Sequence, residues 1–179
     1  MRFINNLVED CFVACYDGWH KALVEINVLI DDEFEGCPEM NWLQGVAEQV
    51  LVAERAGSNV ELGLVIASQE RVRELNRSYL GRDEPTDVLA FSMLPAGGAP
   101  PFVQPPDGVL HLGEVIISYP QAVIQAKEHG HSVKREVAIL IIHGVLHLLG
   151  YEDEKPELKL LMSAREEEIL SHIENILEE

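Results

Sequence analysis

The spacing of apolar residues divides the chain from residue 23 onward into short strands and longer helices. Dense runs of Val, Leu and Ile predict strands at residues 23–30, 59–67, 87–91 and 113–118. Apolar residues three and four positions apart predict helices at about 41–56, 69–79, 120–128, 133–149 and from 156 to the C-terminal end. Because helices and strands alternate irregularly, the expected class is α+β or mixed α/β, with a small four-stranded sheet.

The helix predicted at 133–149 carries two histidines within an apolar run. His143 and His147 are four residues apart, so they lie on the same face of that helix. Gly150 is typical of a residue that ends a helix and lets the chain turn back. Asp153 can then return toward both imidazoles. Two histidines and one carboxylate make three protein ligands, the number that a catalytic zinc site uses while its fourth position stays open for water.

A pair of histidines on an apolar helix face can also be a pair of ordinary core residues with hydrogen-bond partners. Buried imidazoles without partners would leave unsatisfied nitrogen atoms, which costs free energy. A bound metal ion removes this cost. The glycine and the returning carboxylate therefore favour a metal site over the core alternative.

The composition indicates a globular protein, since 47% of the 179 residues are hydrophobic and the mean hydropathy is +0.03. We expect one domain at residues 23–179, preceded by an N-terminal extension at 1–22 that shows no clear period. The three cysteines, an odd and sparse set, favour a reducing cytoplasm over a disulfide framework. Cys11 and Cys15 could form a second metal site, but with no companion ligands nearby we interpret them as ordinary thiols. The longest nearly uncharged run, 137–151, is too short to span a bilayer, so no membrane association is expected.

The net charge of −18 argues at first against a nucleic-acid partner. Its distribution weakens that argument. Residues 1–70 carry a net −10 (3 basic, 13 acidic) and residues 136–179 a net −8 (3 basic, 11 acidic), whereas residues 71–135 are neutral with 7 of each. Four arginines of the neutral segment lie within twelve positions and could form a local basic patch: Arg71, Arg73, Arg77 and Arg82.

Two segments have an irregular pattern. Residues 92–110 contain five prolines and three glycines, which suits either a lid or binding loop or a surface loop without a role. Residues 31–36 (DDEFEG) form an acidic run that could bind a cation but is more often a solvated turn.

Three motifs in a fixed order resemble those of the YbeY family, the bacterial rRNA-maturation endoribonucleases. Residues 85–91 (PTDVLAF) are similar to the family's P-T-[DN]-V-L-S-F, and residues 112–118 (LGEVIIS) to its L-G-D-[IV]-x-I-S strand. Residues 143–151 (HGVLHLLGY) follow its H-G-x-L-H-L-x-G-Y-D-H motif up to the tyrosine. The sequence also has the family's Leu75-Asn76 with Tyr79, and the resemblance covers about residues 23–177.

The resemblance implies a YbeY-like fold, a small mixed sheet flanked by about five helices. It also implies one zinc ion per chain and cleavage of single-stranded RNA in rRNA maturation and ribosome quality control. The partners would be rRNA and the ribosomal small subunit. The sequence departs from the motifs at two positions: the family's third histidine falls on Asp153, and its usual arginine falls on Leu80. Two histidines and one carboxylate still suit zinc, and also Fe(II) or Mn(II).

The expected metal ligands are His143, His147 and Asp153, and the two histidines would act in catalysis through a metal-bound water. Glu152 is an alternative third ligand, but Asp153 has the H-x3-H-x5 spacing. Arg77 and Arg82 are candidate phosphate contacts in place of the absent arginine, unless both are plain surface arginines.

Two other functions stay open. One is a metallohydrolase of another substrate such as a peptidase, which is less favoured because Gly144 stands where H-E-x-x-H proteases have their general base. The other is a non-catalytic, ribosome-associated member of the family.

Overall fold

The computed structural model describes residues 23–31, 34–57, 59–94 and 108–177. The expected N-terminal extension at 1–22 and most of the proline- and glycine-rich segment therefore lie outside the described residues, as do two positions of the acidic run.

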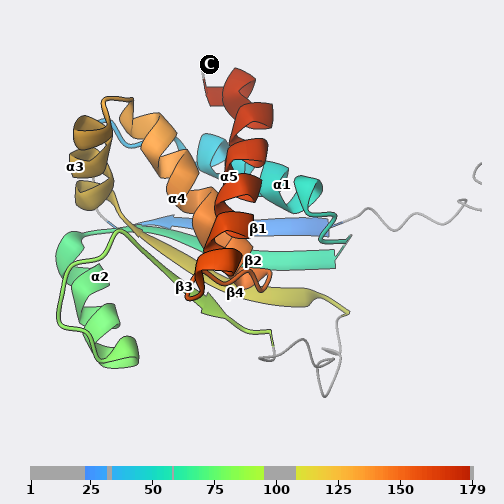
Figure 1. Cartoon of the computed structure of the whole chain (residues 1–179), viewed down its shortest axis with the longest axis horizontal. Coiled ribbons are helices and arrows are strands. Elements are labelled where there is room, and N and C mark those ends of the chain that lie inside the picture. Colours follow the sequence, from blue (N-terminus) through green and yellow to red (C-terminus); the bar gives the residue numbers. More distant parts are fainter. Residues whose placement is uncertain (1–22, 32–33, 58, 95–107, 178–179) are drawn as a thin grey trace, which may run out of the picture.

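A four-stranded mixed sheet forms the centre of the fold (Figure 1). Its strands lie in the order β1 (Leu23–Ile30), β2 (Asn59–Ala67), β4 (Leu110–Ser118) and β3 (Val88–Ser92). β1 and β4 pair with β2 in parallel, while β3 pairs with β4 antiparallel. The predicted α+β class and the four predicted strands are confirmed.

β4 begins at Leu110, three residues before the predicted start at Gly113. The added residues lie at a shift in the pairing register between Glu61 and Leu62 of β2, before the dense apolar run that the prediction used. Gly113 lies at this irregularity with φ of +124°, and a Cβ atom there would come within 2.0 Å of the Phe91 carbonyl oxygen. The close approach of the neighbouring strand therefore requires glycine at this position.

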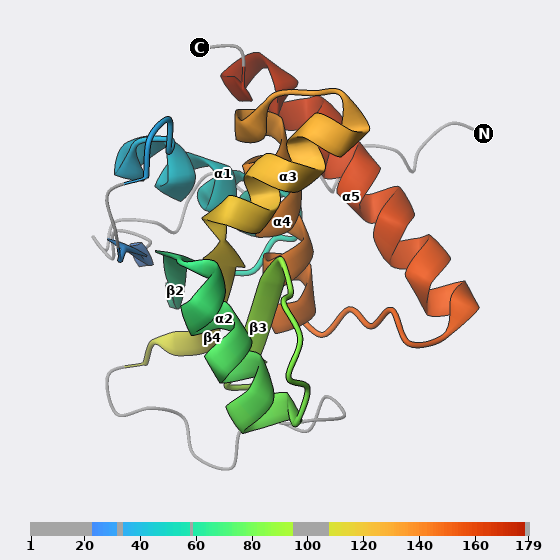
Figure 2. The ribbon, with the colours of Figure 1, turned by 90° about the vertical axis from the view of Figure 1, so that its left-hand side faces the viewer.

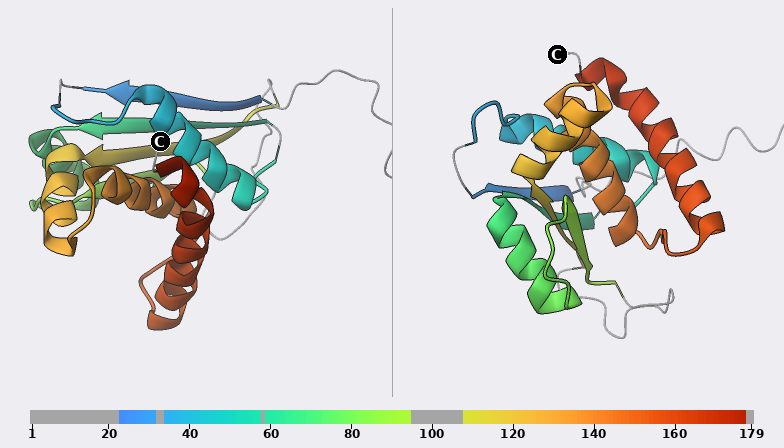
Figure 3. Two further views of the ribbon diagram at one scale, coloured as in Figure 1. Left: turned by 90° about the horizontal axis from the view of Figure 1, so that it is seen from above. Right: turned by 60° about the vertical axis from the view of Figure 1, so that its left-hand side comes forward.

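Within the described residues five α-helices flank the sheet, as predicted. They are α1 (Met40–Ala53), α2 (Gln69–Leu75), α3 (Tyr119–His129), α4 (Val133–Leu148) and α5 (Pro156–Leu177). Figures 2 and 3 show α1, α3, α4 and α5 together on one side of the sheet and α2 alone on the other. None of the helices in the described ranges is long and apolar enough to cross a membrane.

The largest hydrophobic cluster joins the sheet to α1, α3, α4 and α5, and a smaller one lies under α2. α4 is buried on most of its surface because the sheet and three other helices contact it. Ser132 is its N-cap, because the Ser132 hydroxyl accepts a hydrogen bond from the Arg135 amide at 3.1 Å. Gly144 lets α4 lie close to the sheet, because a Cβ atom there would be 2.4 Å from Cγ1 of Val115.

The helix predicted at about 69–79 is regular only as far as Leu75. It then continues as a π-helical turn, η1 (Asn76–Leu80), which ends at Gly81 with φ of +71°. The buried Asn76 donates a hydrogen bond to the Glu84 carbonyl at 2.9 Å. This bond ties the loop after η1 to the first residue of that turn.

Candidate metal centre

The two histidines of α4 face each other near the C-terminal end of the helix. Their Nε2 atoms are 3.0 Å apart, and the rings meet edge to face with centroids 4.5 Å apart. Both side chains are partly buried. The predicted i, i+4 spacing thus brings the two nitrogens to one point.

The other ring nitrogen of each histidine has an oxygen acceptor. Nδ1 of His143 lies 2.7 Å from Oε1 of Glu166, and Nδ1 of His147 lies 2.9 Å from the Tyr151 carbonyl oxygen. A carbonyl and a carboxylate only accept hydrogen bonds, so each Nδ1 carries the hydrogen. In the neutral rings both Nε2 atoms then point lone pairs at each other. This is the arrangement of metal-binding histidines, whose second nitrogen donates to a carboxylate or a carbonyl.

The donor set fits zinc. In a tetrahedral site with bonds of about 2.0–2.1 Å, two coordinating nitrogens lie roughly 3.3 Å apart, close to the 3.0 Å seen here. Oδ1 of Asp153 is 4.0 Å from Nε2 of His147, and the three ligand atoms lie within 4.8 Å of one another. Asp153 is 43% exposed, so its side chain has room to move toward the histidines.

Gly150 ends α4 as predicted, with φ of +96°. The Gly150 amide donates to the His147 carbonyl and the Tyr151 amide to the Leu146 carbonyl, each at 3.0 Å. This pair of bonds is a Schellman motif, and it reverses the chain directly after the helix. The reversal brings both the Tyr151 carbonyl and Asp153 to the histidines.

Glu166 of α5 was not among the site residues predicted from the sequence. A signal was available: Glu166 is four residues after Met162 and three before Ile169, both buried, so it lies on the apolar face of α5. Burial lowers the pKa of His143, but the hydrogen bond and charge of Glu166, with the charges of Asp153 and Asp87, outweigh it. The net pKa of His143 is therefore raised.

A second set of polar contacts fixes the segment around Tyr151, whose carbonyl accepts the hydrogen bond of His147. The Tyr151 hydroxyl donates to Oε2 of Glu54, the residue directly after α1, at 3.0 Å. Arg165 of α5 donates to Oε1 of the same carboxylate and, at 2.8 Å, to the carbonyl of Ala53, the last residue of α1. Burial and the neighbouring Glu54 raise the pKa of Tyr151, so its hydroxyl keeps the proton that it donates. These contacts tie α1, α5 and the end of α4 together behind the two histidines.

The site opens into a groove of about 640 Å³ between α4, β3 and the loop after η1. Leu80 and Arg82 belong to its lining, whereas Arg77, on the exposed part of η1, does not. Of the two arginines predicted to contact phosphate, the structure thus brings only Arg82 to the groove. Among the described lining residues this one arginine stands against four carboxylates, those of Glu84, Asp87, Asp153 and Glu154.

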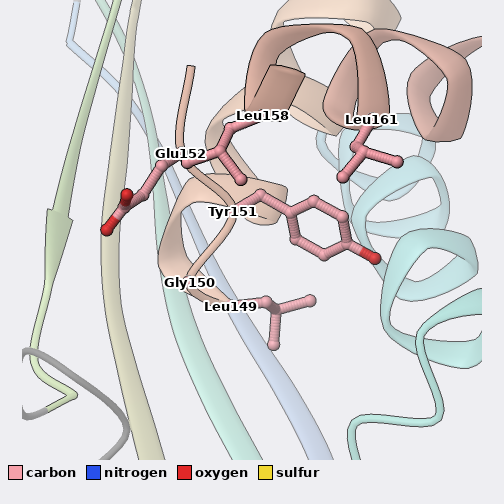
Figure 4. A pocket seen from close by; sticks show the side chains of 6 residues that line it. All are labelled: Leu149, Gly150, Tyr151, Glu152, Leu158 and Leu161. Atoms are coloured by element: carbon pink, nitrogen blue, oxygen red, sulfur yellow. The ribbon is translucent and has the colours of Figure 1, made fainter. Parts of the chain in front are cut away.

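Glu152, the alternative third ligand, lines a different pocket of about 290 Å³ (Figure 4). There the Tyr151 ring lies among Leu149, which directly follows α4, and two leucines of α5, and the Glu152 side chain points away from the ring. The geometry therefore favours Asp153 as the third ligand, and the binding of a metal by this set stays a prediction.

Most of the chain is similar to known proteins of one family. The family model described as Endoribonuclease YbeY matches residues 30–174. An endoribonuclease YbeY of Dehalococcoides mccartyi is 46% identical over 160 residues, which cover 87% of this chain and 93% of the relative. The protein of that name from Moorella thermoacetica is 41% identical over 134 residues, covering 75% of this chain and 86% of the relative.

One solved structure, the solution structure of TM1509 from Thermotoga maritima, matches with a TM-score of 0.53 and 23% identity. The match covers 88% of this chain and 96% of that chain, and it shows a shared fold. The resemblance seen in the sequence motifs is confirmed by the family match and by the curated relatives: this chain belongs to the endoribonuclease YbeY family.

Proposed function

We propose that this protein is a metal-dependent endoribonuclease that cleaves single-stranded RNA in rRNA maturation and ribosome quality control. Its partners would be rRNA and the ribosomal small subunit in the cytoplasm, and residues 23–179 would form the single catalytic domain. The observation that carries the proposal is the pair of facing Nε2 atoms, 3.0 Å apart, at an open groove in a chain of this family.

His143, His147 and Asp153 would hold one zinc ion, or Fe(II) or Mn(II), per chain. A bound ion of this kind polarises a phosphoryl oxygen and lowers the pKa of water. The residues of the chain prepare the site for it: Glu166 and the Tyr151 carbonyl fix the tautomer and orientation of both imidazoles. Arg82, and Arg77 if RNA extends past the groove, would contact phosphate groups.

The main alternative chemistry, peptide hydrolysis, is less well supported. A peptidase of the H-E-x-x-H type needs a carboxylate at the position of Gly144. That position faces the sheet, and a Cβ atom there would already lie 2.4 Å from Val115. No side chain at residue 144 can therefore act as the general base in this fold.

The test is cleavage of a labelled single-stranded RNA, with the same sequence as a duplex for comparison. The protein is stripped with a chelator and reloaded with zinc. We expect cleavage of the single strand only, lost on chelation and in His147→Ala, and retained in the control His172→Ala, an exposed histidine on α5.

Three outcomes would contradict the proposal. RNA cleavage that survives both chelation and His147→Ala would place the activity elsewhere. Cleavage of a generic protein substrate, abolished by His147→Ala, would favour the peptidase. No cleavage by the zinc-loaded protein, with ribosome co-sedimentation unaffected by His143→Ala, would indicate a non-catalytic member.

A further inference from the structure

A second group of two histidines and one carboxylate lies at the opposite end of α4. His129 ends α3, His131 lies in the turn between the helices, and Glu136 lies in the first turn of α4. Their ligand atoms lie within 4.8 Å of one another. We propose that this α3–α4 cluster binds a second transition-metal ion of the zinc, nickel or copper type and thereby fixes the turn between α3 and α4.

The cluster is built around a buried charge. The Glu136 side chain is only 4% exposed. A carboxylate removed from water in this way is costly unless it is paired with a positive charge or bound to a metal. Its Oε2 atom lies 2.9 Å from Nε2 of His131 and 3.3 Å from Nδ1 of His129. Both histidines thus converge on one oxygen.

Both ring nitrogens of His131 face oxygen acceptors. Nδ1 lies 3.2 Å from the Ser132 carbonyl oxygen, and Nε2 lies 2.9 Å from the Glu136 carboxylate. A neutral ring carries one hydrogen, so one of its nitrogens would point a lone pair at an oxygen. A metal ion bound to Nε2 and Glu136 removes this conflict, because Nδ1 then carries the hydrogen and donates it to the Ser132 carbonyl. His147 has the same arrangement, with Nδ1 on a backbone carbonyl and Nε2 free to bind.

The spacing and the donor types agree on the class of ion. Distances of 2.9 and 3.3 Å between donor atoms are close to the roughly 3.3 Å edge of a tetrahedral zinc site. Two imidazoles select zinc, nickel or copper over magnesium and calcium, which prefer oxygen ligands. His129 is 57% exposed, so the ion could reach the cluster from solvent and keep a water as a further ligand.

The two clusters are separate sites. Glu136 precedes His143 by seven residues, about 10 Å along the helix axis. The second ion would therefore contact neither the groove nor the ligands of the candidate metal centre. Its binding does not depend on the proposed RNA cleavage.

The experiment counts bound zinc per chain by elemental analysis after equilibrium dialysis of the full-length protein. All proteins carry Cys11→Ser and Cys15→Ser, so that neither thiol adds a ligand. We expect two zinc ions in this background and one after His129→Ala with His131→Ala. Circular dichroism checks that the double variant folds.

A reciprocal variant separates the two sites. His143→Ala with His147→Ala removes the candidate metal centre and should leave one zinc ion, held by the α3–α4 cluster. The exposed His172→Ala is the matched control and should still bind two. If only the candidate metal centre fails to bind zinc, the background protein binds one ion, and the reciprocal variant still binds that ion.

Two results would overturn the proposal. The first is a zinc count in the background that His129→Ala with His131→Ala does not lower. The second is a reciprocal variant that binds no zinc, which would make the α3–α4 cluster an ion pair between imidazolium and carboxylate.

A single variant replaces the double variant if His129→Ala with His131→Ala does not fold. His129→Gln, at the exposed histidine, should weaken binding of the second zinc ion at least tenfold. An unchanged affinity would reject the site.

Discussion

Glu166 provides the sharpest test of the candidate metal centre, because it touches a ligand but not the metal position. Its Oε1 accepts a hydrogen bond from Nδ1 of His143 at 2.7 Å, and its side chain is 22% exposed. Replacing Glu166 by alanine leaves the ligands in place. It removes the acceptor that fixes the ring orientation and the negative charge that makes Nε2 a stronger donor.

The expected magnitude follows from this role. Loss of such a supporting partner weakens metal binding by about 10- to 100-fold, or roughly 1.4–2.7 kcal/mol. Glu166→Gln should cost less than Glu166→Ala, because the amide oxygen still accepts the hydrogen bond while the charge is lost. Zinc affinity should therefore fall from the wild type to Glu166→Gln and further to Glu166→Ala. The first step measures the contribution of the charge and the second that of the ring orientation.

The assay is a zinc titration against a competing chromophoric chelator at fixed pH. Glu167→Gln is the matched control: it removes the same charge from the exposed neighbouring residue and should leave the affinity within about twofold, as expected for a solvated charge. The reasoning is refuted if Glu166→Ala binds zinc as tightly as the wild type, or if Glu167→Gln weakens binding equally. Either result would mean that the contact with His143 does not support the metal site.

Three further predictions concern the groove, the helix packing and the metal itself. Leu80→Arg, which introduces the family's arginine at the groove, should raise kcat/KM for single-stranded RNA about tenfold. Leu160→Arg, at an exposed leucine of α5, should leave kcat/KM unchanged. An equal gain in both variants would indicate a non-specific charge effect. In urea unfolding, Gly144→Ala should destabilise the protein by about 1–3 kcal/mol, because the added Cβ overlaps Val115. Gly45→Ala on α1 is the control: the added Cβ meets no neighbouring residue within 4 Å, so this variant should be neutral or stabilising. Chelation should lower Tm, since an ion present at a thousand times its Kd stabilises by about 4 kcal/mol; an unchanged Tm would contradict metal binding.

The part of the site that could be predicted from sequence is the part defined by local geometry. The helical period places His143 and His147 on one face, and a glycine at position 150 predicts the turn that returns Asp153. Both features depend on residues within about ten positions of each other. Motif resemblance added the groove residue Leu80, which no local pattern indicates.

The parts that were missed depend on contacts between distant segments. Glu166 supports His143 from another helix, and its acidic neighbours conceal that it shares the buried face of α5. The early start of β4 was missed because the register shift opposite Gly113 belongs to the pairing with other strands. For the same reason the position of Arg77 outside the groove could not be read from its spacing to Arg82.

If the proposed function is right, the charge of the groove requires that a bound metal ion, and not the lining itself, receives the RNA phosphate. Arg82 is the one arginine or lysine among the described lining residues, and four carboxylates surround the same volume. Like charges 4 Å apart repel by about 1 kcal/mol in water and about 4 kcal/mol near a protein surface, so an RNA strand gains nothing from this lining alone. A divalent cation on the two histidines would offset part of that negative charge at the point where a phosphate must bind. The net charge of −18 is then compatible with an RNA substrate, provided that the site is loaded.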